Sequence, residues 1–169
     1  MKDLFTEVVV KKERTAGENF LKNLPVPLAI LFMAAGLFVH PVFLLGLLVA
    51  LLLHYVLSPR LDVEFEYSYV NGELDVAKIF SKQSRKQMAS YNMKEMEIFA
   101  PLSSAHLDGF RGNPAVRKVD YSSGNPSHKE QVYAFVITAD NQKEMILFEP
   151  GEKIIQDLRA RMPQKVYLQ

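Results

Sequence analysis

The side chains that could carry chemistry form one acidic group, one basic group and four scattered histidines. The acidic group contains five carboxylates in two neighbouring segments where they alternate with apolar positions: Asp62, Glu64, Glu66, Glu73 and Asp75. Clustered carboxylate oxygens are ligands that hard divalent cations prefer. Alternate residues of a β-strand, however, point to one face of the sheet. We therefore predict a solvated acidic face here and no metal site.

The densest basic cluster follows directly, in the segment SKQSRK at residues 81–86. Its charge comes from Lys82, Arg85 and Lys86. Near an anionic membrane surface, each basic side chain stabilises binding by about 1 kcal/mol. We predict that these three residues are candidate contacts for lipid headgroups. The alternative interpretation is a solvated turn.

Motifs of the common enzyme classes do not occur in the sequence. It has no Gly-rich phosphate loop, no Gly-x-Ser-x-Gly elbow and no His-Glu-x-x-His zinc motif. Cysteine is absent, which excludes thiolate ligands, disulfides and a thiol nucleophile. We assign no catalytic, cofactor-binding or metal-binding residue and predict a non-enzymatic protein. A net charge of +1, without a basic face that interleaves aromatics, predicts no nucleic-acid partner.

A long uncharged region separates the charged residues into two groups. Residues 23–59 contain no Lys, Arg, Asp or Glu, although the chain holds 20 basic and 19 acidic residues. One helix of about 34 residues would extend about 50 Å, well beyond the hydrocarbon core of about 30 Å. The pair His40-Pro41 lies near the middle, and proline disfavours helix at and before its own position. We predict two short helices, at residues 26–39 and 42–57. They form a transmembrane hairpin or, as the alternative, a re-entrant one.

Basic residues flank this hairpin on one side only. Lys11, Lys12, Arg14 and Lys22 precede it and Arg60 follows it, whereas the connection between the helices has no Lys or Arg. By the positive-inside rule, both ends of the hairpin lie on the cytoplasmic side. The sequence therefore predicts a multi-pass protein of the cell membrane with both termini in the cytoplasm.

Small residues in the second helix offer a packing face. Gly46 and Ala50 are four positions apart, a spacing that lets helices approach closely. This face is a candidate for contact with another membrane protein, and contact within the hairpin is the alternative. The oligomeric state is left open.

The segment before the hairpin is amphipathic. Leu4, Phe5, Val8 and Val9 recur at a helical spacing, with charged residues between them. The pattern is typical of a helix that lies in the membrane interface, and a partner-binding helix is the alternative. We assign residues 1–23 to a cytoplasmic amphipathic segment.

The rest of the chain predicts a small sheet. Residues 61–70 alternate apolar and polar positions, Asn71-Gly72 supplies a two-residue turn, and residues 73–80 return. Alternation around Asn-Gly is the strongest short-range signal for a hairpin. A second hairpin is predicted at residues 132–148. Together, the two hairpins indicate antiparallel strands.

A closing helix and a loop-rich stretch complete this part. The apolar stripe Ile154, Ile155, Leu158 and Met162 predicts an amphipathic helix after the second hairpin. Residues 100–129 are rich in Gly, Pro and Ser, which is typical of an exposed functional loop or of disorder.

Four segments carry a resemblance to a known family: 57–67 (LSPRLDVEFEY), 71–75 (NGELD), 96–101 (MEIFAP) and 147–150 (LFEP). They are similar to a family of two-span membrane proteins of Clostridia-type bacteria. The order of short strands and a closing helix after a two-helix anchor also resembles the bacterial pleckstrin-homology-like (PH-like) membrane proteins. The family has no established activity, so the resemblance implies architecture and membrane location and assigns no functional residues.

These patterns predict an α+β protein in three parts. The amphipathic segment is followed by the hairpin at residues 24–58 and by a cytoplasmic PH-like antiparallel β domain at residues 59–169, closed by the C-terminal helix. We expect a binding module without a cofactor, which contacts the bilayer and either anionic headgroups or a protein partner. The alternative function is an accessory or structural subunit that assembles into a larger membrane complex through the hairpin.

Overall fold

The computed structural model describes residues 5–139 and 141–168, which divide into two compact units. The helical unit consists of Glu13–Val63 and the turn Phe80–Ser84, and the β unit contains the other described residues. The first strand precedes the helical unit in the sequence and the second strand follows it. The apolar hairpin is therefore an insertion between two strands that pair with each other.

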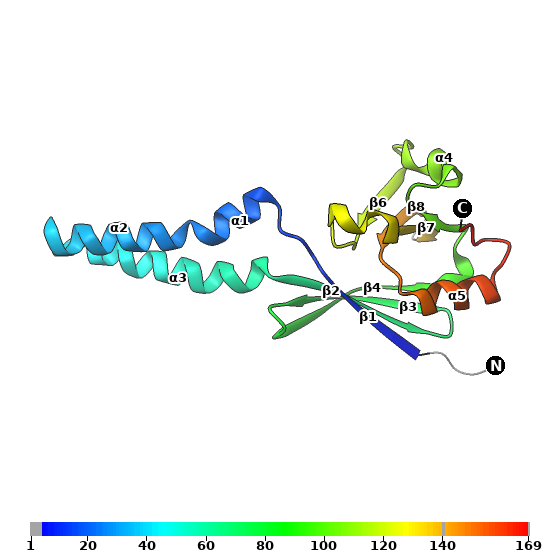
Figure 1. Ribbon diagram of the computed structural model, residues 1–169, viewed down its shortest axis with the longest axis horizontal. Helices are drawn as coiled ribbons and strands as arrows, with labels where there is room; N and C mark the ends of the chain where they lie inside the picture. The colour runs from blue at the N-terminus through cyan, green and yellow to red at the C-terminus, as the bar shows by residue number, and fades with distance from the viewer. Residues whose placement is uncertain (1–4, 140, 169) are drawn as a thin grey trace. The chain divides into compact units, whose positions relative to one another are not determined.

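The helical unit is a hairpin of two nearly continuous helical runs (Figure 1). α1 (Ala16–Asn23) leads into α2 (Pro25–Phe38), and the short helix η1 (Pro41–Phe43) leads into α3 (Leu44–Leu61). Proline begins both α2 and η1, where its missing N–H would have no helical partner in any case. His40 has an extended backbone, so the helix breaks at His40-Pro41 as predicted.

Both helical runs are longer than the sequence predicted. Ala16–Phe38 comprises 23 residues and Pro41–Leu61 comprises 21. At about 1.5 Å per residue they extend about 35 and about 32 Å, which matches a hydrocarbon core of about 30 Å. α2 agrees with the predicted helix at residues 26–39 to within one residue. The helical runs are nevertheless longer, because α1 continues into α2 and because α3 passes through Pro59 beyond the predicted end at residue 57.

Glycine allows α2 and α3 to approach closely. A Cβ atom at Gly46 would lie 2.6 Å from Cδ1 of Phe32, and one at Gly36 would lie 2.5 Å from Cδ2 of Leu44. These distances are far below a carbon–carbon contact of about 3.5–4.0 Å, so neither position has room for a side chain. Ala50, one turn beyond Gly46, is also buried.

Polar contacts close the base of this hairpin. The Arg14 guanidinium donates to Asp62 Oδ1 at 2.7 Å and to the Leu61 carbonyl at 3.1 Å, which ties the start of α1 to the end of α3. The turn Phe80–Ser84 lies against the same end. The Ser81 N–H donates to the Asp62 carbonyl at 2.7 Å, and the Ser81 hydroxyl donates to the Pro59 carbonyl at 3.2 Å.

The β unit begins with a four-stranded sheet in the order β1-β2-β3-β4. Its strands are β1 (Phe5–Lys11), β2 (Val63–Val70), β3 (Glu73–Phe80) and β4 (Ser84–Asn92). Asn71 and Gly72 have positive φ angles of 51° and 97°, as a two-residue hairpin turn requires, which confirms the first predicted hairpin.

The N-terminal segment is a strand where the sequence predicted an amphipathic helix. β1 pairs antiparallel with β2, from Phe5 opposite Val70 to Lys11 opposite Glu64. Burial alternates with a period of two, so Val8 is half-buried while Phe5 is exposed. A run of β-branched valines favours a strand. The helical prediction is wrong for β1 and correct for α1 alone, and Leu4 lies outside the described residues.

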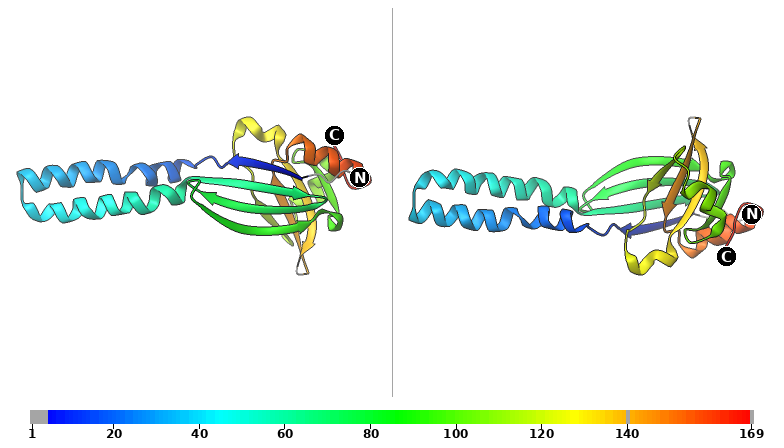
Figure 2. Two further views of the ribbon diagram at one scale, coloured as in Figure 1. Left: turned by 90° about the horizontal axis from the view of Figure 1, so that it is seen from below. Right: turned by 90° about the horizontal axis from the view of Figure 1, so that it is seen from above.

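The second sheet has the order β5-β7-β8-β6, and its strands run in a clearly different direction from those of the first (Figure 2). It contains β5 (Ile98–Pro101), β7 (Tyr133–Ala139), β8 (Gln142–Phe148) and β6 (Val116–Asp120). β7 and β8 confirm the second predicted hairpin. β6 was not predicted, and it pairs parallel to β8.

The loop-rich stretch at residues 100–129 is structured. Besides β6 it holds the short helices η3 (Ala105–Leu107) and α4 (Asp108–Arg111) and the start of η4 (Pro126–Gln131). Leu107 is fully buried, and Phe110 packs against the same small apolar cluster as Val136 and Met145. This stretch therefore covers the face of the second sheet that lies opposite the main core.

Aromatic side chains form the core between the two sheets. The Phe148 ring makes edge-to-face contacts with Tyr67, Phe135 and Phe99, with ring centroids 5.6, 5.5 and 6.1 Å apart. The Tyr67 hydroxyl donates to the Tyr121 carbonyl at 2.6 Å. Tyr67, at an inward position of the alternating β2 strand, thus contributes to this aromatic core.

The C-terminal helix α5 (Glu152–Arg161) closes the β unit as predicted. Ile154 and Leu158 of its apolar stripe are fully buried. Asp157 Oδ2 accepts hydrogen bonds from the Tyr69 hydroxyl at 2.7 Å and from Arg161 Nε at 2.6 Å. The result is the predicted α+β architecture of two apolar helices, antiparallel strands and a C-terminal helix.

Candidate functional site

The three residues predicted to contact headgroups lie in or beside the connection between β3 and β4, and all are exposed. Lys82 belongs to the turn, where it has a φ angle of 58°. Arg85 and Lys86 follow at the start of β4. We call Lys82, Arg85 and Lys86 the basic turn.

Arg85, one of the three cations of the basic turn, forms an ion pair with Glu66 of the β unit. The Arg85 guanidinium donates to Glu66 Oε1 at 2.9 Å, and the Glu66 side chain is only 13% exposed. Lys82 and Lys86 have no ion-pair partner among the residues that the structure describes. Two of the three predicted charges are therefore available to an anionic partner.

Two of the five acidic residues of the first hairpin take part in ion pairs. Glu66 binds Arg85, and Asp62 binds Arg14 at 2.7 Å. Glu73 is exposed, whereas Glu64, Glu66 and Asp75 are half-buried. Within residues 5–139 and 141–168, no three carboxylate or imidazole side chains are grouped to hold a metal ion.

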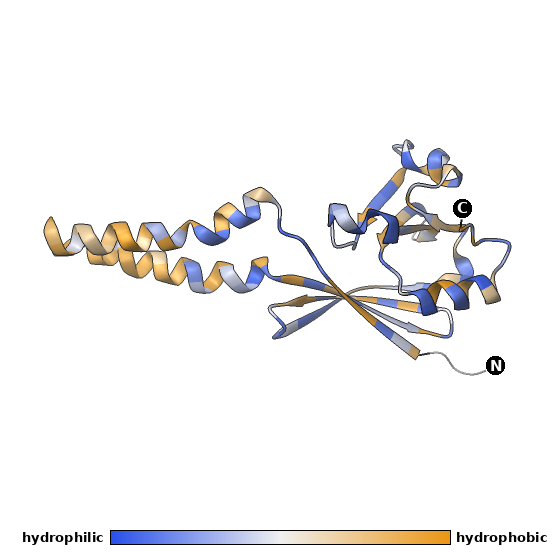
Figure 3. Cartoon of the chain, in the orientation of Figure 1, coloured by the Kyte–Doolittle hydropathy of each residue, from blue (hydrophilic) through white to orange (hydrophobic). Residues whose placement is uncertain are grey.

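The helical unit is hydrophobic along most of its length (Figure 3), and many of its large apolar side chains are exposed. Leu45 and Leu52 of α3, for example, are 65% and 62% exposed. Both helical runs are long and apolar enough to cross a membrane. The basic residues of this unit lie outside the uncharged region at residues 23–59. They are Arg14 and Lys22 before it, and Arg60 and Lys82 after it.

The predicted packing face on α3 makes contact inside the hairpin. Gly46 lies against the Phe32 ring of α2, and Ala50 on the same side of α3 is buried. The small side chains are therefore used to bring α2 and α3 together. The side chains that remain exposed on α3 are large, as Leu48 and Leu52 show.

Sequence reasoning missed a pocket on the second sheet. It has a volume of about 490 Å³ and lies on the face opposite the aromatic core, where Met145 and Leu147 of β8 form its apolar wall. Arg111, Lys118 and Lys129 supply three basic side chains. We call this site the basic pocket. Its cations come from α4, β6 and η4, so no local motif could have shown it.

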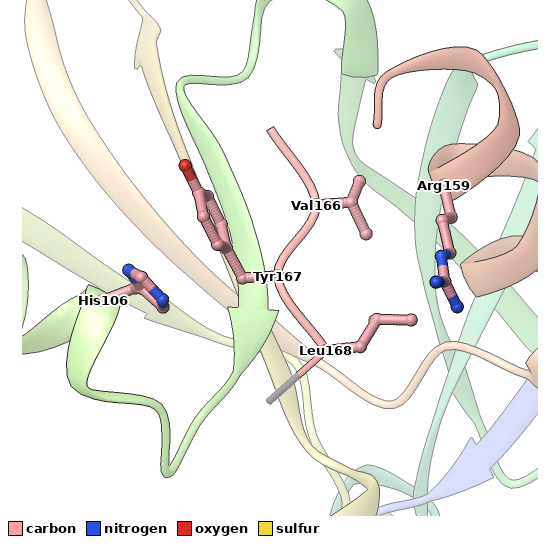
Figure 4. Close-up of a pocket in the computed structure, with 5 residues that line it drawn as sticks. All are labelled: His106, Arg159, Val166, Tyr167 and Leu168. Carbon is pink, nitrogen blue, oxygen red and sulfur yellow. The ribbon is translucent and has the colours of Figure 1, made fainter. Parts of the chain in front are cut away.

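A second pocket, of about 500 Å³, involves the C-terminal residues (Figure 4). Tyr167 stacks on His106 with ring centroids 4.1 Å apart, and the Arg159 side chain extends from α5 on the other side of the pocket. The Tyr167 N–H donates to the Phe99 carbonyl at 2.9 Å, so this segment extends the sheet edge beside β5. The described residues that line this pocket include the His106 imidazole and the Arg159 guanidinium, but no carboxylate that could orient the imidazole.

Two tyrosines of β2 are held in the protonated form. Burial raises the pKa of Tyr67 and of Tyr69 above the ordinary value, and the Asp157 carboxylate that accepts the Tyr69 hydrogen bond raises the pKa of Tyr69 further. These hydroxyls are therefore structural donors between elements of the β unit, and they do not act as acid–base groups at neutral pH.

Two four-stranded sheets and a C-terminal helix that closes them are consistent with a PH-like domain. The model of a family described as bacterial PH-like domain (DUF6106) matches residues 2–168, and the chain belongs to this family. This match confirms the predicted resemblance to PH-like domains, which are generally non-catalytic binding modules. No curated protein and no solved structure matches the chain.

Proposed function

We propose that this protein is a non-enzymatic binding module, anchored in the cell membrane by its helical hairpin, whose basic turn contacts anionic lipid headgroups at the cytoplasmic face. The observation that carries the proposal is the composition of the helical unit. Its two apolar runs expose side chains such as Leu45 and Leu52, and its basic residues lie at one end of the hairpin. Exposure of that surface to water would cost about 25 cal/mol per Å². A bilayer removes this cost.

Ser81 connects the basic turn to the end of α3. Its hydrogen bonds to the Asp62 and Pro59 carbonyls hold the turn at the end of α3, within the same unit. When α3 spans the bilayer, its end lies at headgroup depth, and Lys82 lies there with it. Arg60 and Lys82 then face the leaflet to which the positive-inside rule assigns the basic end. Each charge adds about 1 kcal/mol of attraction to an anionic surface.

A labelled full chain tests this contact. The sequence has no cysteine, so Gln83→Cys introduces a unique thiol into the exposed turn for an environment-sensitive fluorophore. The protein is reconstituted into vesicles of phosphatidylcholine alone or with phosphatidylglycerol. We expect a blue-shifted emission in the anionic vesicles. Addition of about 0.5 M salt should reverse the shift, because it shortens the Debye length to about 4 Å and so screens the attraction to the surface.

Two charge variants test whether the basic turn causes the blue shift. Lys82→Ala with Lys86→Ala should remove most of the blue shift, whereas Lys153→Ala, an exposed lysine of α5, should leave it unchanged. Identical emission in neutral and anionic vesicles would contradict the headgroup contact. Extraction of the full chain from membranes by alkaline carbonate would contradict the anchor itself.

The packing of Gly46 favours the headgroup proposal over the accessory-subunit alternative. That alternative uses Gly46 and Ala50 as a face for another membrane protein, whereas Gly46 lies against Phe32 within the hairpin. The large side chains that remain exposed along α3 are suited to lipid, which requires no specific partner.

A further inference from the structure

We propose that the basic pocket binds a single-chain anionic amphiphile, a carboxylate or phosphate monoester that carries an apolar chain. This inference goes beyond the proposed headgroup contact, and it holds whether or not the basic turn touches lipid. The pocket is formed wholly by residues of the β unit that follow β5.

The pleat of β8 makes the pocket wall apolar. Ile146 and Phe148 point into the core between the sheets, which turns Met145 and Leu147 to the opposite face. Leu147 pairs across the sheet with Ala134, which is itself fully buried. The apolar side chains of Met145 and Leu147 therefore line the pocket on this face.

Three cations from separate elements surround this apolar site. The Arg111 guanidinium donates to the Leu102 carbonyl and, at 3.2 Å, to the Ser104 carbonyl, and it pairs with Asp108 at 3.1 Å. Arg111 is therefore a charge fixed in position at the edge of the pocket.

Lys118 and Lys129 are the cations that can reach a ligand. Lys118 lies opposite Met145 in the parallel β6–β8 pairing, so both point to the pocket face. Lys129 reaches the pocket from η4. Both lysines are exposed, and in the part of the chain that the structure describes neither has an ion-pair partner. Two ammonium groups beside an apolar wall complement an anionic head joined to an apolar body.

The size and the lining favour an amphiphile over other anions. A volume of about 490 Å³ falls within the range of about 300–1,000 Å³ that small-molecule sites occupy. An inorganic anion would leave the Met145 and Leu147 wall unused. A nucleotide would need an aromatic surface on which its base stacks, and the described lining supplies none.

Methyl NMR on the full chain tests the site directly. The protein carries ¹³C-methyl methionine and is held in nanodiscs of neutral phosphatidylcholine, so that the basic turn has no anionic surface to bind. Octanoate, octyl phosphate and octanamide are titrated, and the Met145 resonance is followed. We expect a saturable shift with the two anions and an affinity for octanamide at least tenfold weaker, because the amide has the same chain but no charge.

Charge variants assign the binding to the pocket. Lys118→Gln with Lys129→Gln should weaken octanoate at least tenfold, while the exposed lysines Lys94→Gln with Lys153→Gln should leave it unchanged. The buried Met93 and Met96 methyl resonances report that each variant is folded.

Three outcomes would overturn the inference. These are the absence of a Met145 shift, equal affinity for octanoate and octanamide, or equal weakening by the control pair. In a parallel sample whose discs contain phosphatidylglycerol, a Met145 resonance that is displaced before any ligand is added would assign the pocket to a two-chain membrane lipid instead. A negative result in these neutral discs leaves the headgroup proposal for the basic turn standing, since that proposal concerns anionic surfaces.

Discussion

Phe148 in the β unit and Leu52 in the helical unit are both large apolar residues, yet the first is fully buried and the second is 62% exposed. The same contrast runs through the two units. The β unit excludes water with its own side chains, whereas the helical unit presents an apolar surface to whatever surrounds it. Hydrophobic content alone therefore does not define a core. Truncations of similar size should therefore have very different effects in the two units.

The largest effect is expected for Phe148→Ala. Its ring contacts Tyr67, Phe99 and Phe135, so the truncation leaves a cavity in the middle of the β unit. We expect a loss of about 3–5 kcal/mol in the free energy of unfolding. Denaturant unfolding of the full chain, followed by tyrosine fluorescence and near-UV circular dichroism, measures it. A loss below about 1 kcal/mol would contradict the two-sheet core.

The next effect concerns the interior of the hairpin. Gly46→Leu forces a side chain into the Phe32 ring, and overpacking of this kind typically costs about 1–3 kcal/mol. We expect a lower thermal midpoint of helix unfolding in detergent, measured by far-UV circular dichroism. Phe32→Ala in the same chain should restore part of the loss, because it opens the space that the leucine needs.

Gly17→Leu is the matched control for this substitution. Gly17 lies in α1, and no atom would approach a Cβ there within 4 Å. The same change should therefore be neutral or slightly stabilising, since leucine has a better helix propensity than glycine. Equal destabilisation by both substitutions would show that the close contact between α2 and α3 does not exist.

A smaller effect is expected for Tyr67→Phe. The substitution keeps the ring and removes the hydroxyl that donates to the Tyr121 carbonyl at 2.6 Å. The carbonyl is then buried without that partner, so we expect a loss of about 1–2 kcal/mol in the free energy of unfolding. An unchanged denaturant midpoint at neutral pH would contradict this role for the hydroxyl.

The same tyrosines make stability depend on alkaline pH. Burial raises the pKa of Tyr67, Tyr69 and Tyr91 in the folded state, whereas an unfolded tyrosine has a pKa of about 10. Their contribution is fully present below pH 10 and is lost as the pH rises toward the folded pKa, because the unfolded chain releases protons first. Denaturant midpoints measured from pH 8 to pH 11.5 should fall, and less steeply in Tyr67→Phe.

The smallest effect is expected for Leu52→Ala. If the surroundings of α3 are lipid, the truncated side chain exchanges one apolar contact for another, and the change in hairpin stability should stay within about 0.5 kcal/mol. Thermal unfolding of the hairpin in lipid nanodiscs measures it. A loss comparable to that of Phe148→Ala would mean that Leu52 packs against protein.

Local patterns predicted most of the elements. The alternation around Asn71-Gly72, the hairpin at β7 and β8 and the apolar stripe of α5 all depend on residues close in sequence. β1 was misassigned because apolar residues four positions apart fit a strand as well as a helix. Its partner β2 lies beyond the whole hairpin, so no neighbouring residues could decide between the two.

The candidate sites differ in the same way. Lys82, Arg85 and Lys86 are nearly consecutive, so the basic turn was visible in the sequence. Arg111, Lys118 and Lys129 are spread over three elements, and the parallel pairing of β6 with β8 brings them to one pocket. Parallel strands are joined by long connections, which leave no local turn signal.

By itself, the sequence determined where this protein has an apolar hairpin, two β-hairpins and a closing helix, because each depends on the periodicity and charge of contiguous residues. Only the tertiary structure decided that β1 and β2 pair across the inserted helices, that Gly46 serves the hairpin interior, and that three cations meet at an apolar wall. Those features arise from contacts between residues that are distant along the chain, and periodicity carries no information about such contacts.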